Sequence, residues 1–523
     1  MTRRSDRTQP FRLDPSFPIH PLLAAAYPVV FLFAANAADQ VTLEPLWLPL
    51  FVAVAVAAIA FGGLWALLRD RWRAGLVVTV LVTLFFWYGH AWNLAGTIIG
   101  SHVPLVVAWI AAAVAGVVIA VRAGSWRRPA STLLNLVTAV LVVFNAAGIA
   151  TYSLGATTAA RTTPTGTSSI GHPGPDDPRD VYYLIFDRYA SAASLAEHYG
   201  YDNSPFLDAL RERGFYVADA AYANYIKTPL SLVSSLSMDY LDGEALRSEA
   251  ASARDAGAIH RRLRGQLPVP TEMKRLGYRY VHVANWWEPT ATNAIADIVY
   301  RYEAGSEFSS ALLRMSALGA IGAGAGAQPF DRAVLYEHTL YEFRVLERLA
   351  DDPALTFAFA HFLVPHPPYV FETDGSFVRD EPLATEDERA GYVRQLEYTN
   401  GRILGLIDRL LSVPPEERPI ILLQADEGPF PARYDQGETQ FDWRQATTAE
   451  LAEKFGILSA YHLPGVEPEA AGLYPAITPV NSFRVVFNSY FDADLPLLPD
   501  RVIAHRSLQD WYDFFDVTDR LGG

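Results

Sequence analysis

Long apolar runs fill the first third of the chain, and short apolar runs separated by polar segments fill the rest. A helix that crosses a membrane needs about 20 apolar residues. The long runs therefore predict an α-helical membrane domain of about five spans over residues 20–153. The first run is short and contains Pro28, so it is the weakest of the five. The runs lie at residues 20–37, 45–68, 74–92, 103–121 and 131–153.

Arginines occupy only two of the four connections between these runs. One group lies between the second and third runs and the other between the fourth and fifth; they are Arg69, Arg71, Arg73, Arg122, Arg127 and Arg128. Cytoplasmic connections carry the excess of Lys and Arg. The pattern places residues 1–19, a basic tail, in the cytoplasm. Five crossings then place everything after Tyr152 outside.

The Thr-, Gly-, Ser- and Pro-rich residues 154–178 predict a linker to a second domain, 179–523. In that domain, apolar runs typical of buried strands alternate with helical patterns, which predicts an α/β fold with a mostly parallel central sheet. The expected strands lie at 180–187, 214–217, 278–283, 355–362, 419–428 and 455–461, with helices at 204–213, from Thr228 through 236, and 387–411.

The composition of the chain excludes some classes of binding partner and of chemistry, and it indicates where the protein is located. The net charge of −15 argues against nucleic acid. The absence of cysteine excludes disulfides, thiolate metal sites and a cysteine nucleophile. Abundant alanine and only three lysines are typical of a GC-rich bacterial genome, so the expected location is the bacterial cytoplasmic membrane.

Oxygen-bearing side chains follow the expected strands where each one ends. Asp187 ends the first strand, Asp426 and Glu427 end another, and Thr228 precedes Pro229 at an expected helix start. Parallel strands present their carboxyl ends at one edge of the sheet, where ligands bind. Buried carboxylates are costly unless they are paired or bound to a metal. The pattern predicts a divalent cation site.

Two histidines, His282 and His366, also follow strands and complete this constellation. Several residues have simpler explanations. Thr228 before proline is a common helix start, His361 inside a strand is typical of a packed core histidine, and Lys454 is expected at the surface. The tryptophans Trp286 and Trp287 fit a core or a membrane interface, and the small apolar residues 306–328 fit a surface loop near the membrane.

Taken together, these motifs resemble the sulfatase-like branch of the alkaline phosphatase superfamily. The five spans are similar to those of lipoteichoic acid synthases, and the threonine is similar to that of phosphoethanolamine transferases. The resemblance implies an alkaline-phosphatase-like fold. It also implies that Asp187 and Asp426 are metal ligands and that Thr228 is both nucleophile and ligand. His366, in Pro-His-Pro-Pro-Tyr, and His282 resemble the family's substrate-phosphate histidines.

Glu427 departs from this resemblance, because the family usually has histidine there. Three carboxylates on one ion shift the expected preference from Zn²⁺ towards Mn²⁺ or Mg²⁺. They also weaken the attraction for a phosphate anion, which leaves loss of activity open.

The resemblance implies a phospho-transferase acting outside the membrane, on a lipid or lipid-linked substrate with an envelope glycan acceptor. Two alternatives remain open. One is a phosphatase or phosphodiesterase with the same chemistry, and the other is a non-catalytic membrane protein that binds glycans. The formylglycine mechanism of sulfatases is excluded, because it requires Cys or Ser where this chain has Thr228.

Overall fold

The computed structural model describes residues 14, 16–37, 43–162, 178–265, 267–302, 307–319, 330–378, 388–435 and 441–522. The chain divides into two compact units. The helical unit contains the chain up to Ser153 except residues 38–41, together with Phe308–Pro329. The α/β unit contains residues 38–41, Leu154–Glu307 and Phe330–Gly523.

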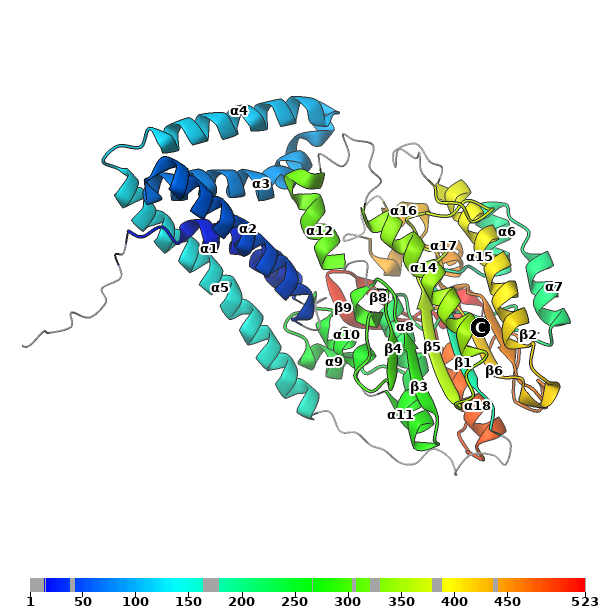
Figure 1. Ribbon diagram of the computed structural model, residues 1–523. Coiled ribbons are helices and arrows are strands. Elements are labelled where there is room, and N and C mark those ends of the chain that lie inside the picture. Colours follow the sequence, from blue (N-terminus) through cyan, green and yellow to red (C-terminus); the bar gives the residue numbers. More distant parts are fainter. Residues whose placement is uncertain are drawn as a thin grey trace, which may run out of the picture. The chain divides into compact units, whose positions relative to one another are not determined.

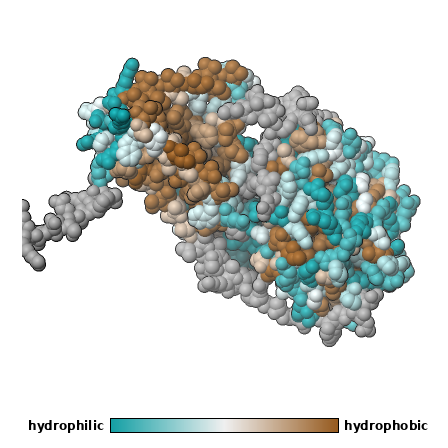
Figure 2. All heavy atoms as spheres, in the orientation of Figure 1, coloured by the Kyte–Doolittle hydropathy of each residue, from teal (hydrophilic) through white to brown (hydrophobic). Residues whose placement is uncertain are grey.

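The helical unit is built from apolar helices whose outer side chains are exposed. Four of them are long and apolar enough to cross a membrane, while α1 is shorter. Their surface is predominantly hydrophobic (Figure 2), as expected for helices that face lipid. These helices, drawn in blue to cyan in Figure 1, are α1 (His20–Ala35), α2 (Glu44–Leu68), α3 (Arg71–Ile99), α4 (His102–Val121) and α5 (Arg127–Thr162).

Helix α5 continues beyond the predicted end of the last span at residue 153. Its last turns, to Thr162, occupy the start of the predicted linker. Residues 163–177 of that linker lie outside the described residues.

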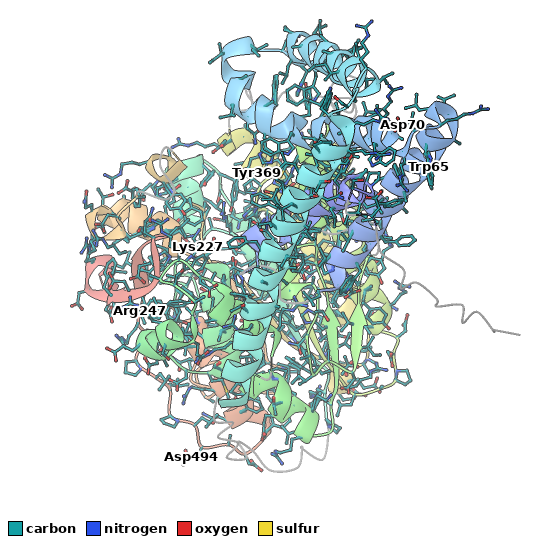
Figure 3. The ribbon with its side chains drawn as sticks, turned by 90° about the vertical axis from the view of Figure 1, so that its left-hand side faces the viewer. Trp65, Asp70, Lys227, Arg247, Tyr369 and Asp494 are labelled. Carbon is teal, nitrogen blue, oxygen red and sulfur yellow. The ribbon has the colours of Figure 1, made fainter. Side chains whose placement is uncertain are left out.

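The two arginine-rich connections meet at one end of the helical unit. Asp70, labelled in Figure 3, accepts hydrogen bonds from the Trp72 and Arg73 amides at 3.1 and 3.2 Å and so caps α3. The same carboxylate lies 3.1 Å from the Arg127 Nε, in the other connection. The Arg128 guanidinium lies 4.3 Å from the centre of the Trp72 ring. The structure thus brings together the basic connections that the sequence predicts on one side.

The segment predicted as a surface loop begins with a helix, α12 (Glu307–Met315), within which Phe308 belongs to the helical unit. Phe308 packs edge-on against Phe33 of α1 at 5.5 Å between ring centres. A side chain at Gly89 of α3 would overlap the backbone of Met315, so glycine permits this close approach. Residues 320–329 of the predicted loop lie outside the described residues.

The α/β unit is organised around a seven-stranded sheet of order β2-β7-β6-β1-β5-β3-β4. The pairs β1–β5, β1–β6, β3–β5 and β3–β4 are parallel, and β7 is antiparallel to both of its neighbours. The strands are β1 (Val181–Phe186), β2 (Tyr216–Val217), β3 (Arg279–Val283), β4 (Ile298–Tyr300), β5 (Thr356–Phe362), β6 (Ile420–Gln424) and β7 (Ser459–His462). The expected mostly parallel sheet is confirmed.

Helices cover both faces of this sheet (Figure 1). On β1, Tyr183 contacts Phe483 of α18 on one face, while Phe186 contacts Phe343 of α14 on the other. The α-helices of the unit are α6 (Ala192–Tyr199), α7 (Ser204–Glu212), α8 (Thr228–Ser237), α9 (Gly243–Glu249), α10 (Gly257–Arg264), α11 (Pro268–Arg275), α14 (Phe330–Leu349), α15 (Glu388–Leu410), α16 (Ala432–Asp435), α17 (Thr448–Phe455) and α18 (Ser482–Tyr490). A separate antiparallel hairpin, β8 (Ile503–Ser507) and β9 (Asp510–Asp516), follows them.

Candidate metal centre and cavity

Three adjacent central strands bring Asp187, His361 and Asp426 together. Strand β1 lies between β5 and β6, with Ile185 opposite both His361 and Gln424. Asp187 follows β1 and Asp426 follows β6, so both carboxylates lie at the carboxyl end of the sheet beside His361. One ligand atom from each of the three side chains lies within 4.8 Å of the others. Within the described part of the chain, this is the one such group of potential metal ligands.

Each member of this cluster holds a buried polar atom without a hydrogen-bond partner. These atoms are Asp187 Oδ1, Asp426 Oδ2 and His361 Nε2. A buried polar group without a partner costs about 1–3 kcal/mol, and more when it is charged. A divalent cation accepts electron pairs from oxygen and imidazole nitrogen, so the donor set fits such an ion.

The acid–base properties of the cluster agree with this fit. Burial, followed by the charges of Asp426 and Glu427, raises the pKa of Asp187 well above its usual value. Burial lowers the pKa of His361 to about 3, with a smaller contribution from His282. The imidazole is therefore neutral at physiological pH, which is the form that binds metals.

Thr228 begins α8 next to this cluster. Pro229 occupies the first turn, and Lys227 is the N-cap residue. The Thr228 hydroxyl donates a hydrogen bond to Asp426. This bond lowers the pKa of that carboxyl against burial and Glu427, which together raise it to about 7. The predicted helix start at Thr228 is therefore confirmed, and its hydroxyl faces the candidate metal ligands.

Glu427 contacts two basic side chains. Its Oε1 lies 3.0 Å from Lys454 Nζ and 3.3 Å from Arg188 Nε, while its Oε2 is buried without a partner. Lys454 is fully buried, so its predicted surface position is wrong. Burial lowers the pKa of Lys454 to about 7, and Glu427 opposes that shift. The sequence analysis expects a third carboxylate, Glu427, to weaken the attraction of the site for a phosphate anion. The contacts with Lys454 and Arg188 oppose that effect.

The backbone beside this ion pair has two unusual features, a positive φ at Arg188 and a close approach at Gly428. Arg188 has a φ of 60°, a left-handed conformation that costs a non-glycine residue roughly 1–2 kcal/mol. Its amide lies 3.3 Å from Asp426 Oδ1. Gly428 N donates to Lys454 O at 2.8 Å, and a Cβ at Gly428 would overlap the Glu453 and Lys454 carbonyl oxygens. Gly428 thus allows the strand end to approach the residue that pairs with Glu427.

A cavity of about 300 Å³ opens over Thr228 and Asp187. Its polar wall includes Arg188 and Lys227, the latter labelled in Figure 3. Lys227 Nζ lies 4.4 Å from the centre of the Phe430 ring, as does the Arg188 Cζ. The remaining lining residues are Pro229, Trp286, Trp287, Glu307, Leu335, Leu363, His366, Pro367, Pro368, Glu427 and Trp511. The cavity thus joins cationic groups to an aromatic wall.

The two predicted catalytic histidines lie in different places. His366 lines the cavity, and burial, together with the Arg188 charge, holds its pKa well below the usual range. His282 is buried on β3, where its Nε2 contacts Thr290 O at 2.8 Å and its Nδ1 contacts Tyr280 Oη at 3.2 Å. His282 is not among the cavity-lining residues within the described chain.

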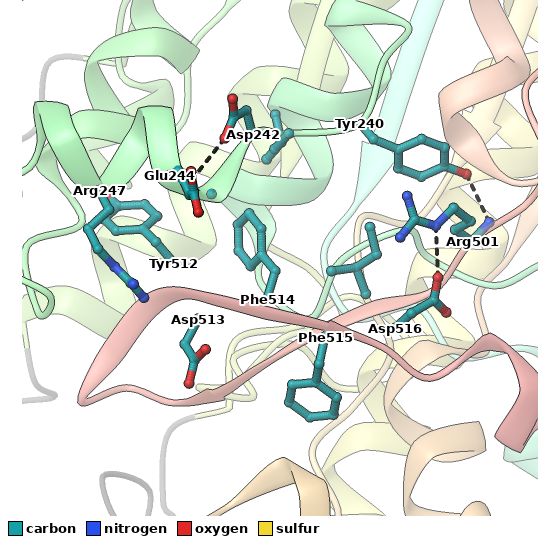
Figure 4. Close-up of a pocket in the computed structure, with 13 residues that line it drawn as sticks. Tyr240, Asp242, Glu244, Arg247, Arg501, Tyr512, Asp513, Phe514, Phe515 and Asp516 are labelled. Carbon is teal, nitrogen blue, oxygen red and sulfur yellow. Dashed lines mark hydrogen bonds and ion pairs between the residues drawn. The ribbon is translucent and has the colours of Figure 1, made fainter.

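A second cavity, of about 420 Å³, lies between the start of α9 and β9 (Figure 4). Both arginines that line it have partners: Arg247 binds Asp510 at 2.8 Å and Arg501 binds Asp516 at 2.7 Å. The candidate metal ligands of the described chain lie elsewhere. The smaller cavity is therefore the candidate active site.

No protein-family model matches the chain, and no curated protein matches it. Among solved structures, it is similar to the C-terminal periplasmic domain of EcEptC from Escherichia coli. The identity is 14%, over 66% of this chain and 94% of that one, with a TM-score of 0.42.

Two further solved structures show a similar level of likeness. The integral membrane lipooligosaccharide phosphoethanolamine transferase A from Neisseria meningitidis is 12% identical, over 90% of this chain and 96% of that one, with a TM-score of 0.40. The lipoteichoic acid synthase LtaP from Listeria monocytogenes is 13% identical, over 64% and 77%, with a TM-score of 0.37.

Proposed function

We propose that this chain is a membrane-anchored, metal-dependent phospho-transferase that uses Thr228 as its nucleophile. One observation carries the proposal. Asp187, His361 and Asp426 come from three adjacent strands, with one ligand atom of each within 4.8 Å of the others. Each side chain also has one buried donor atom without a partner, and the Thr228 hydroxyl bonds to Asp426. Divalent cations are held by donor sets of this kind.

Asp187, Asp426, Thr228 and His361 would hold the ion, with the unpartnered oxygen of Glu427 as a further candidate. When bound, a divalent ion would lower the pKa of the Thr228 hydroxyl and offset the charge of the phosphoryl oxygens. The all-oxygen set expected from the sequence favours Mn²⁺ or Mg²⁺ over Zn²⁺ or Ca²⁺. The His361 nitrogen moves that preference towards Mn²⁺ and Zn²⁺.

The proposed reaction consists of two successive displacements at phosphorus. In the first, Thr228 Oγ attacks phosphorus, the bond from phosphorus to the head-group oxygen breaks, and the hydroxyl proton passes to Asp426. His366, on the cavity wall, supplies the proton that the leaving oxygen needs, because the negative charge of a bound substrate raises its depressed pKa. In the second, an acceptor alcohol attacks the phosphorus and the bond between phosphorus and Thr228 Oγ breaks. The alcohol proton passes to His366, and Asp426 returns its proton to the released Thr228 oxygen.

The cavity supports an anionic substrate with an apolar or ring-shaped part. Arg188 and Lys227 offer positive charge beside Thr228, while Trp286, Trp287 and Trp511 offer flat apolar surfaces. A phospholipid head group or lipid-linked donor fits the charge, and an envelope glycan fits the aromatic wall as acceptor. The positive-inside pattern supports a position of this site outside the cytoplasm.

Replacing the nucleophile tests the proposal directly. In the full-length protein, Thr228→Ala should reduce turnover of labelled phospholipid to background, while the loss of one hydrogen bond costs only about 1 kcal/mol of stability. Thr228→Ser should retain part of the turnover, because the oxygen remains. Ser231→Ala is the matched control, since Ser231 lies one turn later on α8 and donates to Tyr225 O at 3.0 Å. Near-normal turnover in Thr228→Ala would exclude Thr228 as the nucleophile.

Product analysis separates transfer from hydrolysis. The wild-type protein is given labelled phospholipid in liposomes, with and without a cell-envelope extract as acceptor. Transfer predicts label in glycan or lipid together with diacylglycerol. Release of water-soluble phosphate or phospho-alcohol alone, unchanged by the extract, would identify a hydrolase. No turnover with intact ion binding would favour the non-catalytic alternative.

A further inference from the structure

The loop of residues 365–371 follows β5 and carries His366 on the wall of the candidate active site. Pro365, Pro367 and Pro368 surround this histidine, and proline has no N–H to donate. A stretch whose only N–H belongs to His366 cannot be held by the regular hydrogen bonds of a helix or a sheet. Contacts from other elements must therefore fix its position.

Gln395, on α15, makes hydrogen bonds to both ends of this loop. Its Nε2 donates to His366 O at 3.0 Å and to Pro365 O at 3.3 Å. Its Oε1 accepts from the Val370 amide at 2.8 Å and from the Phe371 amide at 3.3 Å. The Gln395 side chain is fully buried. One buried amide group therefore joins the start of the loop to its end.

The orientation of the Gln395 amide follows from its partners. Two backbone N–H groups lie at one end, and only the side-chain oxygen can accept from them. Two backbone carbonyl oxygens lie at the other end, and only the side-chain NH₂ group can donate to them. The two hydrogens of that group match the two carbonyl oxygens, so an exchange of oxygen and nitrogen would lose all four bonds. The whole hydrogen-bonding capacity of the side chain is thus used on this one loop.

Contacts from α15 and α14 hold the far end of the loop. Phe371 stacks on Tyr398 of α15, with 4.2 Å between ring centres and 12° between ring planes. Tyr398 lies three residues after Gln395 and hence on the same side of α15. From α14, Arg332 Nη2 donates to Tyr369 O at 2.7 Å. The far end of the loop is thus anchored, and the Gln395 amide ties the stretch around the histidine to it.

The imidazole of His366 is oriented by the same stretch of backbone. Its Nδ1 contacts Pro367 O. A carbonyl oxygen only accepts, so Nδ1 carries a proton and donates it. Nε2 is then the nitrogen that can exchange a proton with a substrate. When the bond between phosphorus and the leaving oxygen breaks, the Nε2 proton passes to that oxygen, and Nδ1 keeps its own. The position of Nε2 depends on the backbone that Gln395 holds.

We propose that Gln395 is a positioning residue for the transfer reaction, whose side-chain amide holds the loop of residues 365–371 so that His366 Nε2 can protonate the leaving oxygen. The inference rests on the proposed function, in which His366 supplies that proton. Gln395 is not among the cavity-lining residues of the described chain, so it acts through the loop. A displacement of about 1 Å in a catalytic group can cost roughly 10²-fold in rate.

The test gives full-length protein in detergent a labelled phospholipid and, separately, its analogue with sulfur in place of the leaving oxygen. A thiolate leaves without a proton, whereas an alkoxide needs one. Gln395→Met, similar in size but without the amide, should reduce turnover of the phospholipid about 10²-fold and leave turnover of the sulfur analogue near the wild-type value. A general loss of structure would reduce both equally.

Two further variants calibrate this comparison. His366→Ala removes the proton donor and should lose turnover of the phospholipid selectively, by about 10²–10⁴-fold. Thr399→Val is the matched control on the same helix. It removes the buried hydrogen bond from Thr399 Oγ1 to the Gln395 backbone oxygen, at 2.7 Å, and leaves the Gln395 side chain in place. Thr399→Val should turn over both lipids as the wild type does.

The outcomes separate this inference from the proposed function. If the wild type turns over neither lipid, the proposed function fails. If the wild type is active and Gln395→Met affects the two lipids equally, or neither, the positioning role of Gln395 is wrong and the proposed function stands. Gln395→Glu serves as a second variant, because it keeps the size of the side chain but lacks the NH₂ group, and it should show the same selective loss. If thermal unfolding shows that neither variant folds, Gln395 supports the fold itself and the inference is overturned.

Discussion

The contact between Glu427 and Lys454 shows how a single residue can change the chemistry of a neighbouring site. Both side chains are buried, and the ammonium lies 3.0 Å from the carboxylate and 3.4 Å from the centre of the Phe430 ring. The Lys454 charge opposes the effect of Glu427 on the pKa of Asp187 and of Asp426. A carboxylate in place of histidine at position 427 is therefore compatible with an anionic substrate.

Breaking this pair should be costly. Among the described residues, Lys454→Met leaves Glu427 with one cationic contact, Arg188. Removing one partner of a buried ion pair typically costs about 3–5 kcal/mol. We expect the lower part of that range in urea unfolding followed by tryptophan fluorescence. Arg213→Met is the matched control, because it removes an exposed pair with Asp408, at 2.7 Å, that is worth at most about 1 kcal/mol. Equal effects of the two substitutions would contradict a buried pair at Lys454.

Residues that follow strands could be predicted from the sequence, but their partners could not. Asp187, Asp426 and Thr228 stand at the ends of recognisable elements, and the structure places all three together. His361 lies inside an apolar strand, so its own sequence context indicates a core residue. Only the register of β5 against β1 brings it to Asp187. Lys454 was missed for the same reason, since its partner is distant in the sequence.

At the scale of elements, the strands that form the site are those with continuous apolar runs. Strands β1, β5 and β6 are buried at every position, which is typical of the centre of a parallel sheet. The hairpin β8–β9 was not predicted, because His505, Arg506 and several acids interrupt its apolar pattern. Its Trp511 nevertheless lines the cavity. The hairpin thus contributes Trp511 to the site although the sequence has no clear strand pattern there.

Asp180 immediately precedes β1, and its titration should change the stability of the protein measurably with pH. Asp180 Oδ1 accepts from the Thr356 amide at 2.7 Å, and burial raises the pKa of Asp180 to about 6 despite that bond. The folded protein therefore holds this proton more tightly than the unfolded chain, whose pKa is near 3.8. The resulting stabilisation is complete below about pH 4 and is lost as the pH rises through about 6.

Asp180→Asn, which keeps an acceptor oxygen but cannot ionise, should remove this dependence. The free energy of unfolding of the variant should fall less steeply than that of the wild type between pH 4 and pH 6. Asp352→Asn gives a control of opposite sign, because the Ala354 amide and then Arg279 lower the pKa of Asp352. Its stabilisation is present above about pH 4 and is lost as the pH falls. Parallel curves for wild type and Asp180→Asn would show that Asp180 titrates normally.

For the whole molecule, the evidence for orientation in the membrane is a cluster of charged contacts at one end of the helical unit. There Arg71 binds Asp14 at 2.8 Å, Arg127 binds Asp70, and Arg71 and Arg128 flank Trp72. Asp14 and the α2–α3 and α4–α5 connections therefore share one side. The sequence predicted this side from charge alone, and the structure adds that the charged groups are in contact. The sequence predicts five crossings; four of the helices are long and apolar enough to cross a membrane, and α1 is shorter.

The side of the α/β unit does not depend on α1. With both arginine-rich connections in the cytoplasm, α5 must end outside, whether α1 crosses or not. A reporter that is active only outside the cytoplasm should be active when fused after Leu154. The same reporter fused after Gly124, in the α4–α5 connection, is the matched control and should be inactive, because only one helix separates the two points. A reporter that works only inside should show the reverse pattern. Activity of the first reporter at Gly124 and not at Leu154 would invert the orientation and place the Thr228 cavity in the cytoplasm, where it could not reach an envelope glycan.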